Sequence, residues 1–509
     1  MQSPIDTPSS MLEPSPRNLT GGRLLARNTL WNILGQGAPL LVAIFAIPVL
    51  IKALGTDRFG VLTLAWMVIG YFSLFDLGLG RALTQLVAER FGMGRGEEVP
   101  PLAWTALTIM LVLGMLATLT VIGISPWLVY SVLKIPEWLH AETLQSFYLL
   151  AFAIPFVIST SGLRGILEAQ QRFDLVNAVR IPMGVFTFLG PLTVLPFSDS
   201  LVPVISVLLG FRVVAWLVHL LLCLKSLPSL REEFSIRADA IPPLIRLGGW
   251  MTVTNIVGPV MVYMDRFLIG SVVSITAVAY YVTPYEVVTK LWLLPGALVG
   301  VLFPAFSISV GSDQARAAGL YWRGVKYTFI GLFPLTLVIV TFAREGLGLW
   351  LGAEFAENST RVLQWLAVGV FFNSLAYIPF ALVQSAGRSD LTAKLHLIEL
   401  PVYLLALWWL LEVWGVVGAA IAWSGRVVLD TIALFILAGW RVPEVTLVFK
   451  RDALIMITTL VLLAMGGVLR DMAIKTAFLS VVLAGFGLVI WFLFISVEER
   501  AILSRALKT

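Results

Sequence analysis

Apolar runs long enough to cross a membrane recur along almost the whole chain, and this repetition limits the folds open to it. A helix needs about 20 apolar residues to span the hydrocarbon of a bilayer, and its backbone must hydrogen-bond internally there. About fourteen stretches meet this length: 29–51, 60–80, 102–124, 143–162, 177–197, 201–223, 244–269, 278–303, 324–343, 362–385, 394–412, 416–438, 453–470 and 474–497. The sequence therefore predicts an all-α polytopic membrane protein.

The composition excludes several other classes of protein. Of the 509 residues, 59% are hydrophobic and 13% are charged, whereas a soluble domain has roughly 45–50% and about 25%. One core cannot hide such an excess, because cores stop growing at about 250–300 residues. A cytosolic enzyme, a disordered protein and a nucleic-acid binder are therefore excluded. The single cysteine, Cys223, cannot form an intramolecular disulfide, and the three histidines lack metal-ligand spacing, so we expect no metal site.

The distribution of Lys and Arg predicts how the chain sits in the membrane. When the N-terminus is placed inside, 24 of the 35 cations fall in inner segments and three fall within spans. The outer segments hold eight: Lys52, Arg58, Lys134, Arg266, Arg344, Arg361, Arg470 and Lys475. Because cations are concentrated on the cytoplasmic side of membrane proteins, both termini are expected to be cytoplasmic.

The longest inner loop divides the predicted spans into two sets of six. We expect a disordered tail at 1–22, a first lobe at 23–224, an inter-lobe loop at 225–243 and a second lobe at 244–440. The last two spans form a terminal pair within 441–509, which also includes a cytoplasmic tail. Two lobes with an even number of spans share one orientation and are related as parallel repeats.

Three cations are predicted to lie at membrane depth, where charged side chains usually face a cavity or a partner. Lys290 follows Glu286 by one helical turn, and Arg426 precedes Asp430 by one turn, so both can form local ion pairs. Arg212 has no local partner. Two interpretations stay open: structural ion pairs, or a cationic cavity for an anionic substrate. We favour the cavity for Arg212.

Other ionisable residues are candidates for coupling or gating, together with Glu286 and Asp430. Asp265 and Arg266 end the seventh span on its outer side, where such charges can also reach water by snorkelling. Asp76 begins the glycine-rich end of the second span, at Asp76–Gly80, where glycines permit close packing of helices in lipid.

Motifs for energy conversion and catalysis are absent from the sequence. It contains no G-x-x-x-x-G-K-[ST] motif, so we expect no ATP hydrolysis and no cofactor. The longest outer loops, near 125–142 and 344–361, are too short to build a catalytic site with paired carboxylates.

The N-terminal stretch carries motifs that resemble a known family. They are Asn28-x-x-Trp31-Asn32, Leu54-Gly55-x-x-x-Phe59-Gly60 and Asp76-Leu77-Gly78-Leu79-Gly80. This pattern is similar to bacterial polysaccharide exporters of the O-antigen flippase type, which belong to the multidrug/oligosaccharidyl-lipid/polysaccharide exporter superfamily. The resemblance covers mainly residues 25–90 and, more diffusely, 244–303.

The resemblance implies two six-helix lobes around a central cavity, with a terminal helix pair. The cargo would be an isoprenyl-diphosphate-linked oligosaccharide, moved across the bacterial cytoplasmic membrane for surface polysaccharide or lipopolysaccharide synthesis. Other polysaccharide-assembly membrane proteins are possible partners. Arg212, Lys290 and Arg426 would suit the diphosphate, since arginine can bind phosphate oxygens bidentately and lysine acts as a point charge. Two alternatives remain: a cation-coupled multidrug antiporter of the same fold, and a membrane enzyme acting on lipid-linked sugars.

Overall fold

The computed structural model describes residues 22–71, 76, 78–170, 172–232, 234–244 and 263–494. Every regular element among them is a helix. Most of the tail expected at 1–22, most of the seventh span and the last residues of the chain lie outside this description. Nine of the described helices are long and apolar enough to cross a membrane. The all-α membrane fold is thus confirmed, while the count of fourteen spans stays a prediction.

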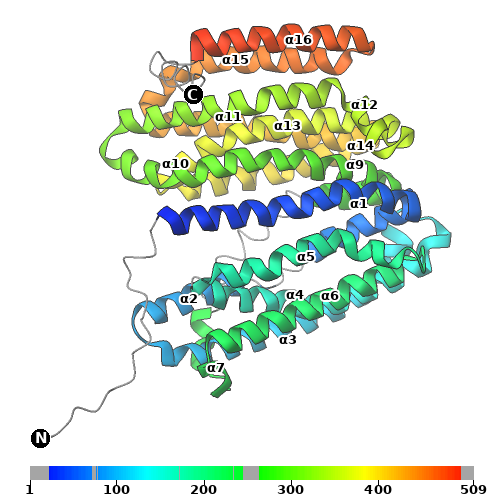
Figure 1. Ribbon diagram of the computed structural model, residues 1–509, viewed down its shortest axis with the longest axis vertical. Coiled ribbons are helices and arrows are strands. Elements are labelled where there is room, and N and C mark those ends of the chain that lie inside the picture. Colours follow the sequence, from blue (N-terminus) through cyan, green and yellow to red (C-terminus); the bar gives the residue numbers. More distant parts are fainter. Residues whose placement is uncertain are drawn as a thin grey trace, which may run out of the picture.

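The helices form two groups that lie side by side (Figure 1). The first group contains α1 (Gly22–Tyr71), α2 (Leu79–Gly92), α3 (Val99–Trp127), α4 (His140–Ala169), α5 (Phe173–Val194), α6 (Leu201–Ser226) and the short α7 (Ser229–Glu232). The second contains α9 (Ile275–Val288), η7 (Thr289–Trp292), α10 (Leu293–Ser312), α11 (Gln314–Thr341), α12 (Ala343–Leu351), α13 (Ala353–Ser385) and α14 (Ser389–Arg441), with a helical segment at 263–272 before α9.

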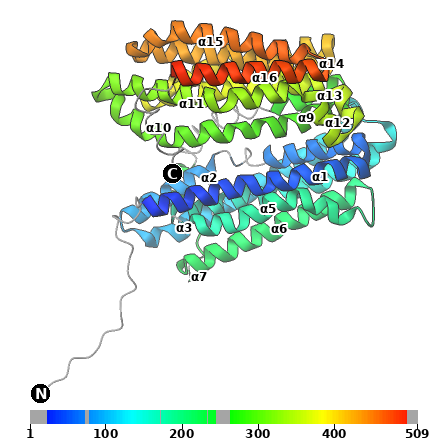
Figure 2. The same cartoon turned by 45° about the horizontal axis from the view of Figure 1, so that its top comes forward.

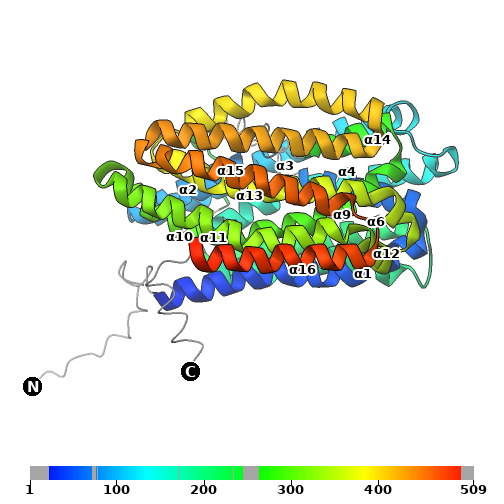
Figure 3. The ribbon, with the colours of Figure 1, turned by 90° about the horizontal axis from the view of Figure 1, so that it is seen from above.

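Two further helices, α15 (Pro443–Val468) and α16 (Met472–Val489), lie on the far side of the second group. Figure 2 shows them stacked beyond α11 and α13, and Figure 3 shows their axes running along the long helices beneath them. Both helices pack on α11. Much of their outer surface is apolar and exposed, as at Leu454 and Val481, which is the surface that lipid covers.

Glycines with positive φ divide two helices that are otherwise continuous. Gly55 has φ 77° within α1, and Gly415 has φ 56° within α14. A left-handed residue is accessible to glycine at little steric cost. Each helix therefore bends at its glycine into two segments. The bend at Gly415 places residues 396–403 of α14 beside residues 423–430 of the same helix.

Some span boundaries differ from those expected. The described part of the second span, predicted at 60–80, reaches Tyr71, and a separate helix α2 begins at Leu79 after Gly78, which has φ 72°. The eighth span, predicted at 278–303, consists of α9 and α10 joined by the short 3-10 helix η7. Pro284 and Pro295 flank this segment, and proline removes helix hydrogen bonds.

The two groups touch at the end of the molecule where α1 bends. Asp57 accepts a hydrogen bond of 2.5 Å from Thr276, and Glu354 accepts one of 2.9 Å from Thr56. At Gly60 a Cβ atom would lie 2.3 Å from the carbonyl oxygen of Ile275, so only glycine permits this approach of α1 to α9. Buried apolar residues continue from α1 into α9 and α13, and this shared core joins the groups.

Candidate functional site

A cavity of about 350 Å³ lies within the first group, between α4, α5 and α6. Arg212 of α6 lines it together with two further arginines, Arg164 of α4 and Arg180 of α5. Arg212 has no ion pair or hydrogen bond to another residue in the described part of the chain. Arg164 is paired with Glu168 at 3.3 Å on the same helix. The hydroxyls of Thr160, Ser161 and Thr187 also line the wall. Three guanidinium groups and several hydroxyls provide many donors for an anion.

Asp76 is engaged in packing beside this cavity. Its carboxylate accepts a hydrogen bond of 2.8 Å from Ser161 and another of 2.8 Å from the backbone N–H of Gly78. At Gly80 a Cβ atom would lie 2.8 Å from both the Asp76 Oδ2 and the Ser161 Oγ. The glycine-rich sequence therefore lets the chain approach α4 closely enough for Asp76 to bond to it, as close helix packing requires.

A second cavity, of about 440 Å³, lies within the second group between η7, α10, α13 and α14. Arg426 and Asp430 line it, one helical turn apart on α14. The rest of the wall is largely aromatic, with one amide: Tyr285, Trp292, Asn373, Tyr377, Phe380 and Trp423. Aromatic faces combined with a few polar groups are typical of a site for an organic ligand.

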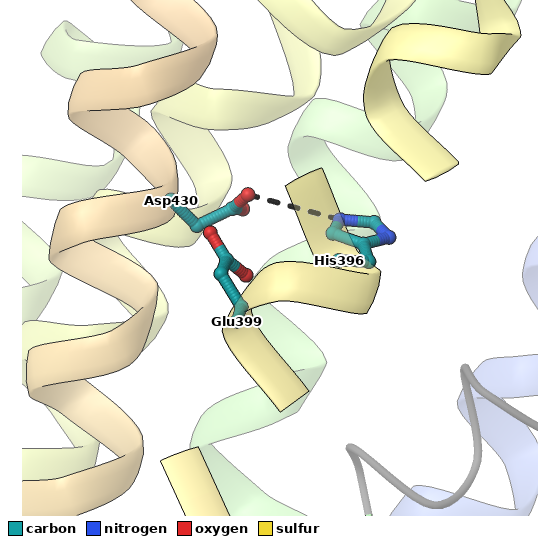
Figure 4. A group of neighbouring side chains, drawn as sticks. All are labelled: His396, Glu399 and Asp430. Carbon is teal, nitrogen blue, oxygen red and sulfur yellow. Dashed lines mark ion pairs between the residues drawn. The ribbon is translucent and has the colours of Figure 1, made fainter. Parts of the chain in front are cut away.

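The charged residues of this second cavity pair across the bend in α14. Figure 4 shows His396, Glu399 and Asp430 pointing toward one another. His396 Nε2 lies 3.7 Å from Asp430 Oδ1, and an Arg426 guanidinium nitrogen lies 4.0 Å from Glu399 Oε2. The local Arg426–Asp430 pair expected from the sequence is therefore replaced by pairs across the hairpin. The reason is the bend at Gly415, which brings the two segments of α14 together.

The cluster of His396, Glu399 and Asp430 has the side chains of a cation site. One ligand atom from each lies within 4.8 Å of the others. The guanidinium of Arg426, however, already supplies a positive charge beside Glu399, and it also lies over the ring of Tyr403 at 5.3 Å. Electrostatic repulsion from Arg426 disfavours a metal ion, so the arrangement is better described as a buried ion-pair network.

A third cluster lies where the two groups meet. Glu286 of α9 pairs with Arg266 at 3.1 Å and with Lys290 at 3.5 Å. The expected Glu286–Lys290 pair is thus confirmed. Arg266 is 3% exposed and lies 4.9 Å from the ring centres of both Tyr263 and Tyr285.

Asp265 completes this cluster and is fully buried. It accepts hydrogen bonds from the Tyr281 hydroxyl at 2.5 Å and from the backbone N–H of Arg266 at 2.7 Å. Asp265 and Arg266 therefore face protein, and the snorkelling considered for them does not occur. Beside them is a cavity of about 180 Å³ between the groups, lined by α1, α5, α9 and the segment 263–272.

The three cations proposed for substrate binding do not share one cavity. Arg212 lines the first cavity, Arg426 lines the second, and Lys290 lies in the 3-10 helix η7 as the partner of Glu286. Sequence reasoning missed four charged residues of these sites: Arg164, Arg180, His396 and Glu399. His396 and Glu399 are spaced i, i+3 inside a predicted span, a pattern that could have indicated them. Arg164 and Arg180 each fall at the edge of a predicted span, so cation counting places them in inner segments and not at membrane depth.

Comparison with known proteins identifies the family. Residues 25–310 match the family described as polysaccharide biosynthesis protein. A protein of Shigella flexneri named as an O-antigen transporter is 31% identical over 411 residues, which cover 81% of this chain and 96% of the relative. The chain belongs to the polysaccharide biosynthesis protein family. The resemblance expected from the N-terminal motifs is confirmed.

Solved structures show how this member of the polysaccharide biosynthesis protein family relates to other transporters by fold. An inward-facing multidrug resistance transporter of the MATE family superposes with a TM-score of 0.65 at 16% identity, covering 81% of this chain and 98% of the transporter. The lipid II flippase MurJ in an inward closed conformation gives 0.61 at 12% identity, covering 86% of this chain and 98% of MurJ. At these identities the likeness concerns the fold alone.

Proposed function

We propose that the protein is a flippase that moves an isoprenyl-diphosphate-linked oligosaccharide across the bacterial cytoplasmic membrane. It would serve surface polysaccharide or lipopolysaccharide synthesis, as the name of the Shigella flexneri relative suggests. The observation that carries the proposal is the cavity lined by Arg164, Arg180 and Arg212. Among them Arg212 lies within a predicted span and has no partner among the described residues, and such a charge is costly at membrane depth unless an anion enters the cavity. A diphosphate offers oxygens for bidentate pairing.

The two cavities suit different parts of such a cargo. We assign the diphosphate to the first cavity, with Arg212 as its central ligand. The second cavity has aromatic rings beside Arg426, Asp430 and Asn373, so it suits sugar rings, which present apolar faces and hydroxyl edges. Lys290, 39% exposed in η7 between α9 and α10, would attract the cargo toward the space between the two groups of helices.

Alternating access would then proceed by movement of two lobes, 23–224 and 244–440, linked by the loop 225–243. The contacts of Thr56, Asp57 and Gly60 hold the predicted outer end together. Asp265, Arg266 and Glu286 lie where the two groups meet. They border the cavity between the groups, so separating the groups would expose this charged cluster, which suits it to gating. Asp430 and Asp76 remain candidates for coupling, with Asp76 held mainly in packing.

The chain would lie in the inner membrane with both termini cytoplasmic, and other polysaccharide-assembly membrane proteins would act on the exported units. The proposed transport requires neither ATP hydrolysis nor a catalytic residue in this chain. The space between the lobes would admit the cargo from the cytoplasmic side, because the described contacts between them lie at the opposite, outer end.

The test is export in a strain that lacks the gene and carries variants. Arg212→Gln should reduce surface glycan about 10- to 100-fold, because a charge-assisted hydrogen bond contributes about 1.5–3 kcal/mol. Lipid-linked oligosaccharide should accumulate on the cytoplasmic side. Arg212→Lys should retain part of the export, since it keeps the charge but loses bidentate geometry. Arg316→Gln, an exposed arginine on α11, is the control.

Three outcomes would change the assignment. Normal export by Arg212→Gln at normal membrane levels would remove Arg212 from the cargo site. Normal surface glycan in the deletion strain, with raised sensitivity to cationic dyes, would favour the multidrug antiporter. Turnover of a lipid-linked sugar by the purified protein would favour the membrane enzyme.

A further inference from the structure

A polar cavity of about 570 Å³ lies away from the cargo cavities, at the end of the second group that is predicted to face outward. Its walls come from α12, the first turns of α13, and the connection between α15 and α16. The residues proposed above for cargo binding, coupling and gating do not line it. The terminal helix pair is required to form the cavity, because residues 467–475 of that pair supply one wall.

The lining carries an excess of positive charge. Arg344, Arg361, Arg470 and Lys475 line the cavity, with Glu345 and Glu357 as the acidic residues. Lys475 is 5% exposed and pairs with Glu345 at 2.8 Å, so these two charges compensate each other. The three arginines have no hydrogen bond or ion pair from their side chains to other described residues. Three guanidinium groups thus face one remaining carboxylate.

This concentration of cations runs against the general charge bias of the chain. The predicted outer segments hold only eight Lys and Arg, and four of the eight line this one cavity. Cations in short outer loops oppose the positive-inside preference during insertion. If these four cations were scattered, they could not share a ligand. Their convergence on one cavity therefore indicates a site that binds an anion.

The cavity walls are held by contacts that do not involve the arginines. Gln364 donates hydrogen bonds to the carbonyl oxygens of Val340, at 3.0 Å, and Gly467, at 3.1 Å, which joins α13 to α11 and α15. At Gly466 a Cβ atom would lie 2.6 Å from the hydroxyl of Thr341, so α15 and α11 approach closely. Asp471 caps α16 by accepting from the N–H groups of Ala473 and Ile474. The walls are therefore fixed, while the exposed guanidinium groups stay available.

We propose that this cavity binds the phosphate group of an anionic lipid at the outer leaflet. Arginine clusters favour phosphate because the guanidinium fork matches two phosphate oxygens. Basic pockets between membrane helices bind anionic headgroups on the cytoplasmic side of membranes, and the same pairing of cations with phosphate applies at the outer leaflet. The phosphate can come from a bilayer phospholipid or from the diphosphate of the cargo after its transfer. The second source rests on the proposed function, and the first does not.

The test uses the full-length protein in nanodiscs and the variant Arg361→Gln/Arg470→Gln. This variant leaves Lys475, Glu345 and Gln364 in place, so the walls should persist. The matched control is Arg81→Gln/Arg316→Gln, which removes two exposed arginines that are predicted to lie inside. Native mass spectrometry would count phosphatidylglycerol retained relative to phosphatidylcholine. The ratio of retained phosphatidylglycerol to phosphatidylcholine should be about tenfold or more higher for wild type and control than for the variant. Loss of two charge-assisted contacts implies a difference of this size.

Competition then distinguishes the two sources of phosphate. If undecaprenyl diphosphate displaces phosphatidylglycerol from wild type at concentrations where inorganic phosphate does not, the cavity accepts the cargo diphosphate. If phosphatidylglycerol remains bound, the site is a phospholipid site. Equal retention by wild type, variant and control would overturn the proposal. Arg212→Gln should leave this binding unchanged while reducing export, so failure of the proposed function and failure of this site are separately visible.

Discussion

At the scale of single residues, the charges within the predicted spans fall into two kinds. Arg212 faces a cavity without a partner among the described residues, whereas Arg266, Glu286 and Lys290 form a connected network. An unpaired cation is available to a ligand, and a paired cation first has to leave its carboxylate. Cargo binding is therefore expected to depend most directly on Arg212, and gating on the network.

Arg426 can be tested for a structural role and a cargo role separately. Its guanidinium lies between the charge of Glu399 and the ring of Tyr403. Arg426→Gln alone leaves Glu399 and Asp430 close together without this cation, and removing one partner of a buried pair costs about 3–5 kcal/mol. We expect a lower Tm and little export from that variant.

The double variant Arg426→Gln/Glu399→Gln separates the two roles. It should recover most of the lost Tm, because fewer uncompensated charges remain in the cavity. Export should stay low if Arg426 also binds cargo. Thermal melts of the purified variants beside glycan export in cells would measure both quantities, and full recovery of export would assign Arg426 a purely structural role.

At the scale of helices, the contact between α1 and α9 controls the outer end. In Gly60→Ala the new methyl group would meet the carbonyl oxygen of Ile275, and this is backbone that cannot turn aside. We expect α1 and α9 to separate at that end and export to fall. Gly123→Ala in α3 is the control, since its added methyl would meet nothing within 4 Å.

This separation can be measured by thiol labelling. Thr63 is buried beside the cavity between the groups and is a suitable probe as Thr63→Cys in a Cys223→Ser background. A membrane-impermeant reagent added outside should label the probe faster in Gly60→Ala than with native Gly60. Equal labelling rates would contradict a role for Gly60 in closing the outer end.

The terminal helix α16 is joined to α12 by a salt bridge that should respond to acid. Partial burial raises the pKa of Glu345, but the hydrogen bond from the Lys475 ammonium, a backbone hydrogen bond and the charges of Lys475 and Arg344 together outweigh it, so the pKa lies below the ordinary value of 4.5. A depressed pKa means that the stabilisation is complete above pH 4.5 and is lost as the pH falls through the lower folded-state pKa.

The measurement is the Tm of wild type and of Glu345→Gln across acidic pH. At neutral pH the variant should be less stable, by on the order of 2–3 kcal/mol, because Lys475 is left buried without its partner. The two Tm values should converge in acid, where protonated Glu345 resembles glutamine. A difference that is independent of pH would show that the ion pair is not its source.

At the scale of the whole molecule, the turns between helices provide a test of orientation. The α5–α6 turn and the α10–α11 turn lie at opposite ends of the molecule (Figure 1). Cation counting places Asp199, in the first turn, outside and Arg316, at the start of α11 just after the second turn, inside. Asp199→Cys should therefore react with an impermeant thiol reagent in intact cells, and Arg316→Cys only after permeabilisation. The reverse pattern would invert the topology and the direction proposed for transport.

The sequence alone determined the class of this protein, because that class depends on the apolar content of consecutive residues, which is local in the sequence. Repeated apolar runs predict membrane helices wherever the backbone must satisfy its own hydrogen bonds. The motifs between Asn28 and Gly80 indicated the family. The Glu286–Lys290 pair was also predictable, since residues four apart on a helix are neighbours.

Only the tertiary structure decided which charges share a site. Arg426 pairs with Glu399 because α14 folds back at Gly415, and no local spacing encodes that contact between segments 27 residues apart. Arg164, Arg180 and Arg212 come from three helices and meet only when those helices pack. The outer cation cavity likewise requires α12, α13 and the α15–α16 connection together. Helix formation depends on neighbours in sequence, whereas these cavities depend on the relative placement of distant helices, which side-chain packing sets.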